Sequence, residues 1–431
     1  MAVKNLVALL LAILQFLVFK PVMIRNEITQ SQNYAVSASA GSLWESVCRE
    51  NERCIAADSD GTNFLLLEDN FPEEALSILD IRTGRRTAVY FGSLTNAELM
   101  ADSCMRSVLG SKITDAQKEA MLKKYGSAEN LVAKLGWKGV KARAAGGGYF
   151  LAESGMLGLV RIDIRTGEAL HLESCSQASL NRNGDLAIYF ARERRFFIVP
   201  AGTAIPNEVQ GDVPSNAQIN AICLLSDGSV WTAESVMRSE KMTVNGKEIL
   251  AFDVSFACYS EDGRELRRVQ SGCIRTGYLP AKLMYSEETD TMIASCANLG
   301  PVWVFGREDD TAKVLAPQSL IPPVLKKADR EETVDEAGVL LKDARMLLPI
   351  GLSAAGGKLL VMDADSGYVF LADLNTLQAE TILTYEQVSK LIEEKPNEFR
   401  GFVFLADMFW NGTDLLCNPA GGSMIRLPIG K

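Results

Sequence analysis

The sequence predicts an all-β fold, a β-propeller of about seven four-stranded antiparallel blades with short helical insertions and an N-terminal hydrophobic helix. A pair of short apolar segments joined by a tight-turn signal recurs seven times between residues 54 and 420. In many copies a second hairpin follows the first, and two hairpins in succession make one four-stranded sheet. Because one such sheet cannot bury both of its faces, we expect the repeats to stack around an axis.

The first hairpin of each repeat carries the stronger signal. In most copies Asp-Gly, Asn-Gly or Gly-Gly stands between the apolar segments. These pairs favour two-residue turns, because such turns need positive φ angles. The seven copies are residues 54–69, 140–154, 178–192, 219–235, 282–298, 349–365 and 404–420.

The second hairpin is clearest at residues 77–91 and 159–173, which share the string Asp-Ile-Arg-Thr-Gly. Residues 369–383 keep the same frame, and weaker versions occur at 256–270 and 302–316. The third repeat has no clean final strand, so six or eight blades remain open. The last repeat ends one strand short, and a strand from Ala35–Val47 would close the propeller and remove its open edge.

These units resemble the β-propeller repeats of the quinoprotein-like and NHL-like superfamily over roughly residues 50–430. The resemblance is one of architecture, so it implies the fold and no particular activity. Quinoprotein enzymes carry a Trp after each Thr-Gly turn, whereas this chain has Tyr90-Phe91 and Leu172 in the matching stretches. This departure argues against a quinone, and we expect no cofactor.

Three insertions with helical character interrupt the repeats, at about residues 95–136, 326–342 and 384–395. In the first, four apolar residues fall on one helical face: Ala97, Met100, Cys104 and Val108. Thr114 with Gln117 forms a capping-box pattern, and Ser127 and Gly136 bound a further helix.

All three insertions fall between the last strand of one repeat and the first strand of the next, so they share one face of a propeller. Long loops on a rigid scaffold concentrate function, and we therefore expect this face to bind a protein or a small molecule. The alternative is that the insertions only cover the end of the channel. Loops on this face supply the candidate ligand-binding residues: Glu153, Arg192, Arg195, Glu234, Asn298, Asp363 and Asp365.

The N-terminal segment differs from the rest of the chain. Asn5–Ile24 is a nearly unbroken apolar run that spans about 30 Å as a helix, enough to cross a bilayer if Lys20 snorkels. We expect residues 1–25 to be a signal anchor, with a cleaved signal peptide or a buried helix as alternatives. Residues 26–43 then form a spacer and residues 44–431 the propeller. The protein would be membrane-anchored and extracytoplasmic, at the cell surface or in the periplasm, or secreted if cleaved.

Composition excludes some function classes. The 431 residues carry a formal net charge of −10, which argues against broad binding to nucleic acid. A single histidine, His171, makes most zinc sites improbable, and we expect no metal. Nine cysteines leave at least one unpaired; Cys48 and Cys54 are the best candidates for a local disulfide, and several others sit in apolar strand patterns typical of buried thiols.

The sequence thus favours a membrane-tethered binding or scaffold module over an enzyme, and it offers no catalytic residues. No nucleophile elbow and no phosphate-binding loop occur. The alternative is a lactonase-like propeller hydrolase or lyase with a carboxylate or metal site at the channel mouth.

Overall fold

The structure is a computed structural model that describes residues 52–58, 61–68, 73–92, 94, 96–172, 175–203, 207–209, 216–244, 247–274, 279–296, 301–315, 349–363, 368–383, 405–410, 414–419 and 425–428. The N-terminal hydrophobic segment, the spacer and the second and third predicted insertions lie outside these residues. Among the described residues no helix is long and apolar enough to span a membrane.

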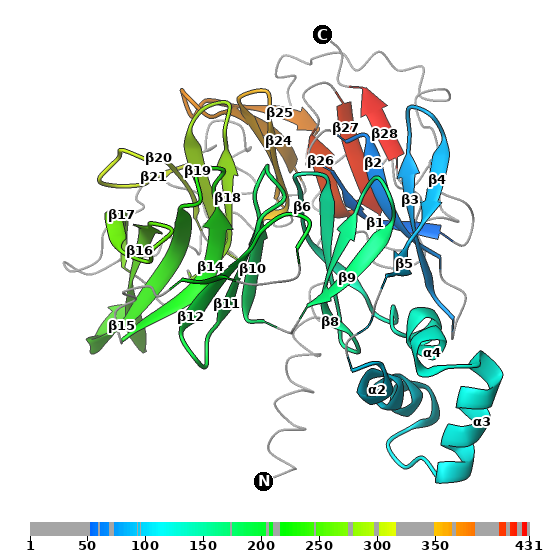
Figure 1. Cartoon of the computed structure of the whole chain (residues 1–431). Helices are drawn as coiled ribbons and strands as arrows, with labels where there is room; N and C mark the ends of the chain where they lie inside the picture. The colour runs from blue at the N-terminus through cyan, green and yellow to red at the C-terminus, as the bar shows by residue number, and fades with distance from the viewer. Residues whose placement is uncertain are drawn as a thin grey trace. The chain divides into compact units, whose positions relative to one another are not determined.

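The described strands form antiparallel sheets that follow the chain in order, as Figure 1 shows. Blade 1 consists of β1 (Glu52–Ala57), β2 (Asn63–Glu68), β3 (Ala75–Asp80) and β4 (Arg85–Ala88). Blade 2 consists of β6 (Lys141–Gly146), β7 (Tyr149–Ser154), β8 (Gly158–Asp163) and β9 (Glu168–Leu172). Blade 3 consists of β10 (Gln177–Leu180), β11 (Leu186–Phe190), β12 (Arg195–Val199) and β13 (Asn207–Val209).

The second half of the chain continues the pattern. Blade 4 consists of β14 (Ala217–Leu224), β15 (Val230–Val244), β16 (Lys247–Tyr259) and β17 (Glu265–Ile274). Blade 5 consists of β18 (Pro280–Ser286), β19 (Thr291–Cys296), β20 (Val302–Gly306) and β21 (Lys313–Val314). Blade 6 consists of β22 (Pro349–Ala355), β23 (Lys358–Asp363), β24 (Tyr368–Asp373) and β25 (Ala379–Leu383). A last sheet holds β26 (Leu405–Trp410), β27 (Asp414–Pro419) and β28 (Ile425–Pro428).

The fold is therefore an all-β propeller with four-stranded antiparallel blades, as predicted. The first strands of neighbouring blades contact one another from β1 through β18, β22 contacts β26, and β27 returns to β1. The predicted count of about seven four-stranded blades is not met, because six blades have four antiparallel strands and the last sheet has three. The missing strand was expected from Ala35–Val47, which lies outside the described residues.

Apolar alternation explains why these segments form blades. In β2 and β7 the buried positions Leu65, Leu67, Phe150 and Ala152 face a common cluster, while Leu66 and Leu151 point to clusters on the opposite faces of their sheets. Each strand thus buries both faces between two neighbouring blades. This explains why the strand patterns are richer in apolar residues than those of a half-exposed sheet.

The first predicted helical insertion is confirmed between blades 1 and 2. It contains α2 (Ala97–Leu109), α3 (Asp115–Tyr125) and α4 (Ala128–Leu135). The capping box of Thr114 and Gln117 forms, and the Ser127 side chain caps α4, which ends at Gly136. Before the helices, the short strand β5 (Tyr90–Phe91) leaves blade 1 and pairs in parallel with β9, so it ties the two blades together.

One extension was not predicted. Strands β15 and β16 continue far beyond the predicted hairpin ends and pair from Val230↔Tyr259 out to Val244↔Lys247, with a register shift between Met237 and Lys241. An Asn-Gly pair at residues 245–246 joins them, which is a strong hairpin signal. The repeat pattern does not include this turn, because it lies in the connection between the second and third strands of the blade.

Most described cysteines are buried, within the blades as their apolar strand patterns predicted, or in α2 in the case of Cys104. Cys104, Cys223 and Cys258 are unpaired thiols with little or no exposure. Burial raises the pKa of Cys104 and of Cys258 to about 11 and that of Cys223 to about 12. The thiol of buried Cys54 donates to the Ala56 carbonyl at 3.1 Å. Its pairing with Cys48 stays a prediction, since Cys48 lies outside the described residues.

Candidate functional site

The antiparallel order of the strands gives the propeller two different faces. The turn face carries the turns that join the first to the second strand and the third to the fourth strand of each blade. The insertion face carries the connections from second to third strand and from one blade to the next. The helices α2–α4 and the far end of the β15–β16 hairpin belong to the insertion face, at the lower edge of Figure 1.

The helical insertion is anchored by an apolar cluster that it shares with blades 1 and 2. Leu131, Val132 and Leu135 of α4 are buried with Cys104 of α2 and with Trp137. The Trp137 ring stacks on Phe91 of β5, with ring centroids 4.9 Å apart and an interplanar angle of 7°. The insertion is therefore part of the interface between the two blades.

The outer part of the insertion exposes apolar side chains. Leu99 of α2 is 71% exposed, Leu109 is 41% exposed and Leu122 of α3 is 37% exposed, and Tyr90 of β5 is half exposed. Helix α3 has no buried residue at all. Since two further large exposed apolar residues among those described, Met237 and Leu266, belong to blade 4, most such residues lie on or beside the insertion.

The sequence-predicted site residues have different environments. Glu153, near the end of β7, pairs with Arg143. Arg192 is exposed in the turn between β11 and β12, and Arg195, 56% exposed, pairs with Glu208 at 3.3 Å. Asp363 is buried at the end of β23, whereas Asn298 and Asp365 lie outside the described residues. Glu153 and Arg195 thus have separate partners and are not joined to each other.

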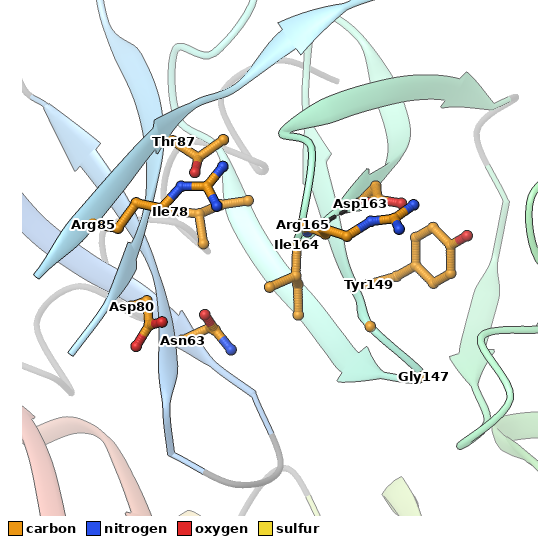
Figure 2. Close-up of a pocket in the computed structure, with 11 residues that line it drawn as sticks. Asn63, Ile78, Asp80, Arg85, Thr87, Gly147, Tyr149, Asp163, Ile164 and Arg165 are labelled. Carbon is orange, nitrogen blue, oxygen red and sulfur yellow. Dashed lines mark hydrogen bonds between the residues drawn. The ribbon is translucent and has the colours of Figure 1, made fainter. Parts of the chain in front are cut away.

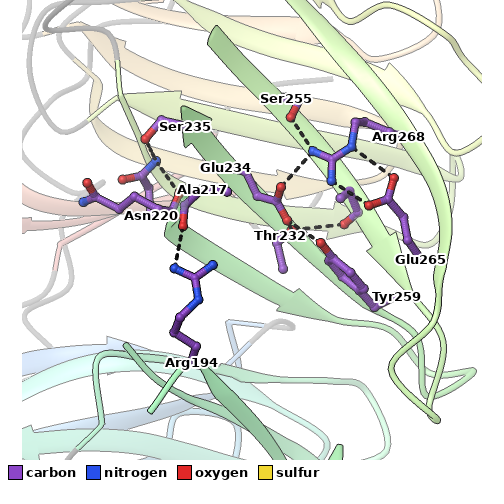
Figure 3. Close-up of polar contacts among 12 residues, drawn as sticks. Arg194, Ala217, Asn220, Thr232, Glu234, Ser235, Ser255, Tyr259, Glu265 and Arg268 are labelled. Atoms are coloured by element: carbon purple, nitrogen blue, oxygen red, sulfur yellow. Dashed lines mark hydrogen bonds and ion pairs between the residues drawn. The ribbon is translucent and has the colours of Figure 1, made fainter. Parts of the chain in front are cut away.

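Glu234 is the predicted site residue whose setting differs most from the expectation. The pattern placed it in a loop at a strand end, but it lies within β15, and its side chain is fully buried. Its carboxylate accepts hydrogen bonds from Tyr259 Oη at 2.7 Å, Thr232 Oγ1 at 2.8 Å and Arg268 Nη1 at 2.7 Å (Figure 3). Its acceptors are therefore used inside the protein.

The Glu234 cluster lies on the side of blade 4 that packs against blade 3. Arg268 also binds both oxygens of Glu265, at 3.0 and 2.6 Å, and Ser255 Oγ at 2.7 Å. The Tyr259 ring lies 6.1 Å from that of Phe196 in blade 3, and Arg194 of blade 3 donates to the Ala217 carbonyl of β14 at 3.0 Å (Figure 3). Every guanidinium group here has a partner, as buried charges require.

The electrostatics of this cluster follow from its geometry. Burial, together with the Glu234 carboxylate, raises the pKa of the Tyr259 phenol, so this group stays protonated and donates. Burial alone would lower the pKa of Arg268, but the hydrogen bonds and charges of Glu265 and Glu234 raise it. The Tyr259 phenol and the Arg268 guanidinium group therefore both keep their protons at physiological pH.

A cavity of about 460 Å³ lies between blades 1 and 2, and we call it the blade 1–2 cavity (Figure 2). Blade 1 lines it with Asn63, Asp80, Arg85 and Thr87, and blade 2 with the turns at residues 147–149 and 163–165. Most of these residues are at turns or at strand ends next to turns, so the cavity belongs to the turn face. No predicted site residue lines it, because the three insertions directed the prediction to the opposite face.

Two turns that line the cavity carry the shared string Asp-Ile-Arg-Thr-Gly. Both copies form the same turn: the Asp80 carboxylate accepts from the Arg82 and Thr83 N–H groups, and that of Asp163 accepts from the Arg165 and Thr166 N–H groups. What the string did not predict is that the two turns line one cavity.

Among the described residues, no group of three or more His, Cys, Asp and Glu is placed to hold a metal ion. His171 contacts the Leu157 carbonyl through Nε2 at 2.7 Å, within blade 2. Asp58 lies at the predicted hairpin turn of the first repeat, and its Oδ1 accepts from the Thr62 and Asn63 N–H groups at 2.8 and 3.1 Å.

No protein-family description and no curated protein matches this sequence. Solved structures with a similar fold include the β-propeller domain of Cps50 (Swd1) from Myceliophteria thermophila, with a TM-score of 0.48, 8% identity, and coverage of 90% of this chain and all of that one. The structure of U3-55K gives a TM-score of 0.46 at 9% identity, and the match covers 90% of this chain and 99% of that one. Hydrazine synthase of Kuenenia stuttgartiensis gives a TM-score of 0.45 at 8% identity, and the match covers 88% of this chain and 96% of that one. Likenesses at this level carry no argument about function.

Proposed function

We propose that this chain is a protein-binding scaffold module that docks a partner protein on its insertion face. The observation that carries the proposal is the concentration of exposed apolar side chains on a helical insertion that is itself firmly anchored. Leu99, Leu109 and Leu122 present their side chains to solvent from α2 and α3. Exposed apolar groups gathered on one element are typical of interaction surfaces.

The anchoring of the insertion supports this proposal. A rigid scaffold lowers the entropy that a surface loses on binding. Helix α4 and Trp137 are buried between the blades. Helix α3 buries no residue completely, but Met121 and Tyr125 pack against the same cluster, and Tyr125 donates a hydrogen bond to Glu73 at 2.9 Å. Helix α3 is thus held on one side, and its exposed side chains on the other are available to another protein.

The experiment is affinity capture from an extract of the source cells, comparing the wild-type chain with Leu99→Glu and Leu122→Glu by quantitative mass spectrometry. Both side chains are exposed, so the substitutions leave the core intact. We expect a partner that the wild type enriches and that each variant enriches about tenfold less, the loss typical of a central interface residue.

The matched control is Leu266→Glu, which introduces the same charge at a residue of β17 that is 53% exposed. It should retain the partner. Equal loss with Leu266→Glu would point to a general effect of charge, and no specific partner in the wild type would contradict the proposed function.

We also propose that residues 1–25 tether the module to a membrane, with the propeller on the extracytoplasmic side. The support is the apolar composition of Asn5–Ile24 and its flanking Lys4 and Arg25. Alkaline carbonate extraction of membranes tests it: an anchored chain stays in the pellet, and a cleaved one appears in the soluble fraction with a new N-terminus. A full-length chain in the soluble fraction contradicts the tether.

For the fold, we propose that a strand from Ala35–Val47 supplies the fourth strand of the last sheet and so completes a seventh blade. The support is that this sheet has three described strands and contacts blade 1 through β27. Deleting residues 1–48 should then lower the unfolding midpoint, whereas deleting residues 1–33 should not.

A further inference from the structure

The turn face is closed by contacts between neighbouring blades at several places around the propeller. Asn183 of blade 3 donates to the Ser226 carbonyl of blade 4 at 3.0 Å, and Ser226 donates to Glu287 of blade 5. The Gly357 N–H of blade 6 donates to Glu288 of blade 5 at 2.7 Å. Between blades 2 and 3 the turns lie so close that a Cβ on Gly147 would stand 1.9 Å from the Gly184 nitrogen. At the turns of blades 1 and 2, in contrast, lies the 460 Å³ cavity.

Two arginines line this cavity, one from each blade. Arg85 is at the start of β4, directly after the first Asp-Ile-Arg-Thr-Gly string, and Arg165 is the arginine of the second copy. Both side chains are exposed, and neither guanidinium group has a hydrogen bond or ion pair in the part of the chain that the structure describes. Arg85 extends from blade 1 toward the space between the blades, and Arg165 extends on the side of Tyr149 (Figure 2).

The two aspartates of the cavity form no ion pair with these arginines among the described residues. Oδ1 of Asp80 and Oδ1 of Asp163 are occupied by backbone N–H groups of their own turns, at distances of 2.8 to 3.4 Å. Desolvation alone would raise the pKa of Asp80, but the Thr83 and Arg82 hydrogen bonds and the nearby Arg82 charge lower it. The aspartates therefore hold the turns in shape.

The remaining walls offer apolar contact. Ile78 is almost completely buried and Ile164 is half-buried, and both belong to the apolar cluster between the blades. The Tyr149 ring is held in place because the Arg161 guanidinium lies 5.0 Å from its centroid. Arg161 itself donates to carbonyls of blade 3, including Pro200 at 3.2 Å, so it is part of the scaffold.

We propose that the blade 1–2 cavity binds a small organic oxyanion, whose carboxylate or phosphate group is held by Arg85 and Arg165. Guanidinium groups bind both kinds of oxyanion through paired N–H donors. The cavity volume is in the range of small-molecule sites, and Tyr149, Ile78 and Ile164 supply the apolar surface for the carbon skeleton. The site lies on the face opposite the proposed protein-docking surface, so the two proposals are tested by different substitutions.

Isothermal titration calorimetry on the full chain at low ionic strength tests the proposal, with inorganic phosphate and succinate as the two probes and sodium chloride at matched ionic strength as the blank. We expect saturable binding of at least one probe. Binding of phosphate alone assigns a phosphate ligand, binding of succinate alone assigns a carboxylate, and binding of both supports the shared oxyanion chemistry.

Arg85→Gln and Arg165→Gln should each weaken binding about tenfold, because each removes one charged hydrogen-bonding group. Arg82→Gln is the matched control: it lies in the same turn as Arg85, its side chain is 74% exposed, and it does not line the cavity. It should bind as the wild type does. Absence of binding of both probes by the wild type, or an equal loss in Arg82→Gln, overturns the proposal.

Discussion

The interface between blades 3 and 4 and the interface between blades 1 and 2 use arginine in opposite ways. In the first, Arg268 is engaged by Glu234, Glu265 and Ser255. In the second, Arg85 and Arg165 line a water-accessible cavity without a side-chain partner in the described part of the chain. Burial decides the difference, because a desolvated guanidinium group must be paired whereas a hydrated one need not be. A paired arginine therefore indicates structure, and an unpaired one in a cavity is available to a ligand.

The two interfaces also differ in how their blades are joined. Blades 1 and 2 share one apolar cluster that continues into α2 and α4, whereas blades 3 and 4 combine a smaller apolar cluster with the Glu234 cluster. Substitutions at the two interfaces should therefore destabilise the fold for different reasons: lost apolar packing between blades 1 and 2, and lost charge pairing between blades 3 and 4.

The largest effect is expected from Trp137→Ala, which empties the apolar junction of the helices and blades. Trp137 is 2% exposed and stacks on Phe91, and removal of such a side chain costs about 4 kcal/mol. Urea unfolding followed by fluorescence measures the loss. Leu122→Ala, at an exposed position of α3, should change stability by less than about 0.5 kcal/mol. Similar values for both would mean that the insertion is not part of the blade 1–2 interface.

A matched pair of glycines tests how the turns of blades 1 and 2 are packed. Gly84 and Gly167 occupy the same position of the shared string, with φ angles of 69° and 78°. A Cβ at Gly84 meets nothing within 4 Å, whereas one at Gly167 would lie 2.2 Å from the Ala88 carbonyl oxygen of blade 1.

Gly84→Ala should therefore cost only the backbone strain, about 1 kcal/mol. Gly167→Ala should cost about 2 kcal/mol more, because blade 1 must also move. Thermal unfolding of the two variants gives the difference directly, and equal destabilisation would contradict the close contact between the second turn and blade 1.

In the blade 3–4 interface, Glu234→Gln should destabilise by about 2 kcal/mol. The amide keeps the shape but removes the charge that pairs with Arg268, which retains Glu265 and is 25% exposed; this partial exposure makes the cost smaller than for a fully buried pair. Glu308→Gln is the control, since Glu308 is 89% exposed in its pair with Arg267 and should contribute almost nothing. If both variants unfold alike, the Glu234 cluster is not the structural element described.

The smallest effect concerns the rate at which buried thiols react in the native chain. Since burial raises the pKa of Cys104 and Cys258 to about 11 and of Cys223 to about 12, these thiols stay neutral at pH 8 and should react with an alkylating reagent only after unfolding. A thiol whose pKa is raised in the folded state stabilises the fold at pH values below the pKa of the same thiol in the unfolded chain. This stabilisation is lost as the pH rises from about 9 toward 11. Rapid modification of these residues in the native chain at pH 8 would contradict their burial.

Much of the fold was predictable from the sequence because it depends on local signals. Hairpin turns follow from Gly, Asn and Asp pairs, and the helices of the first insertion follow from the Thr114 capping box and the Ser127 cap. The repeat pattern does not predict the β15–β16 extension, although Asn245-Gly246 signals a turn, because the predicted copy covers residues 219–235 and ends before that turn. The alternation of apolar residues in a strand does not define at which residue a long hairpin ends.

The candidate sites depend on contacts between blades, and such contacts leave no local signal. The pattern gave Glu234 and Glu153 the same position, yet Arg268 and Tyr259 of the same blade enclose Glu234, whereas Glu153 pairs with Arg143 near solvent. Likewise, the two Asp-Ile-Arg-Thr-Gly strings predict two turns and not the cavity between them. Which repeats leave a gap is decided by packing around the axis.

The most direct test of the proposed function is photo-crosslinking at two positions of the full-length chain in its own cell extract. A photoreactive phenylalanine analogue replaces Leu99 on the insertion or Leu266 on β17, both exposed, and the products are separated by size. Docking on the insertion face predicts a discrete higher-mass adduct from position 99 and none from position 266. No adduct from position 99, or the same adducts from both positions, would contradict it.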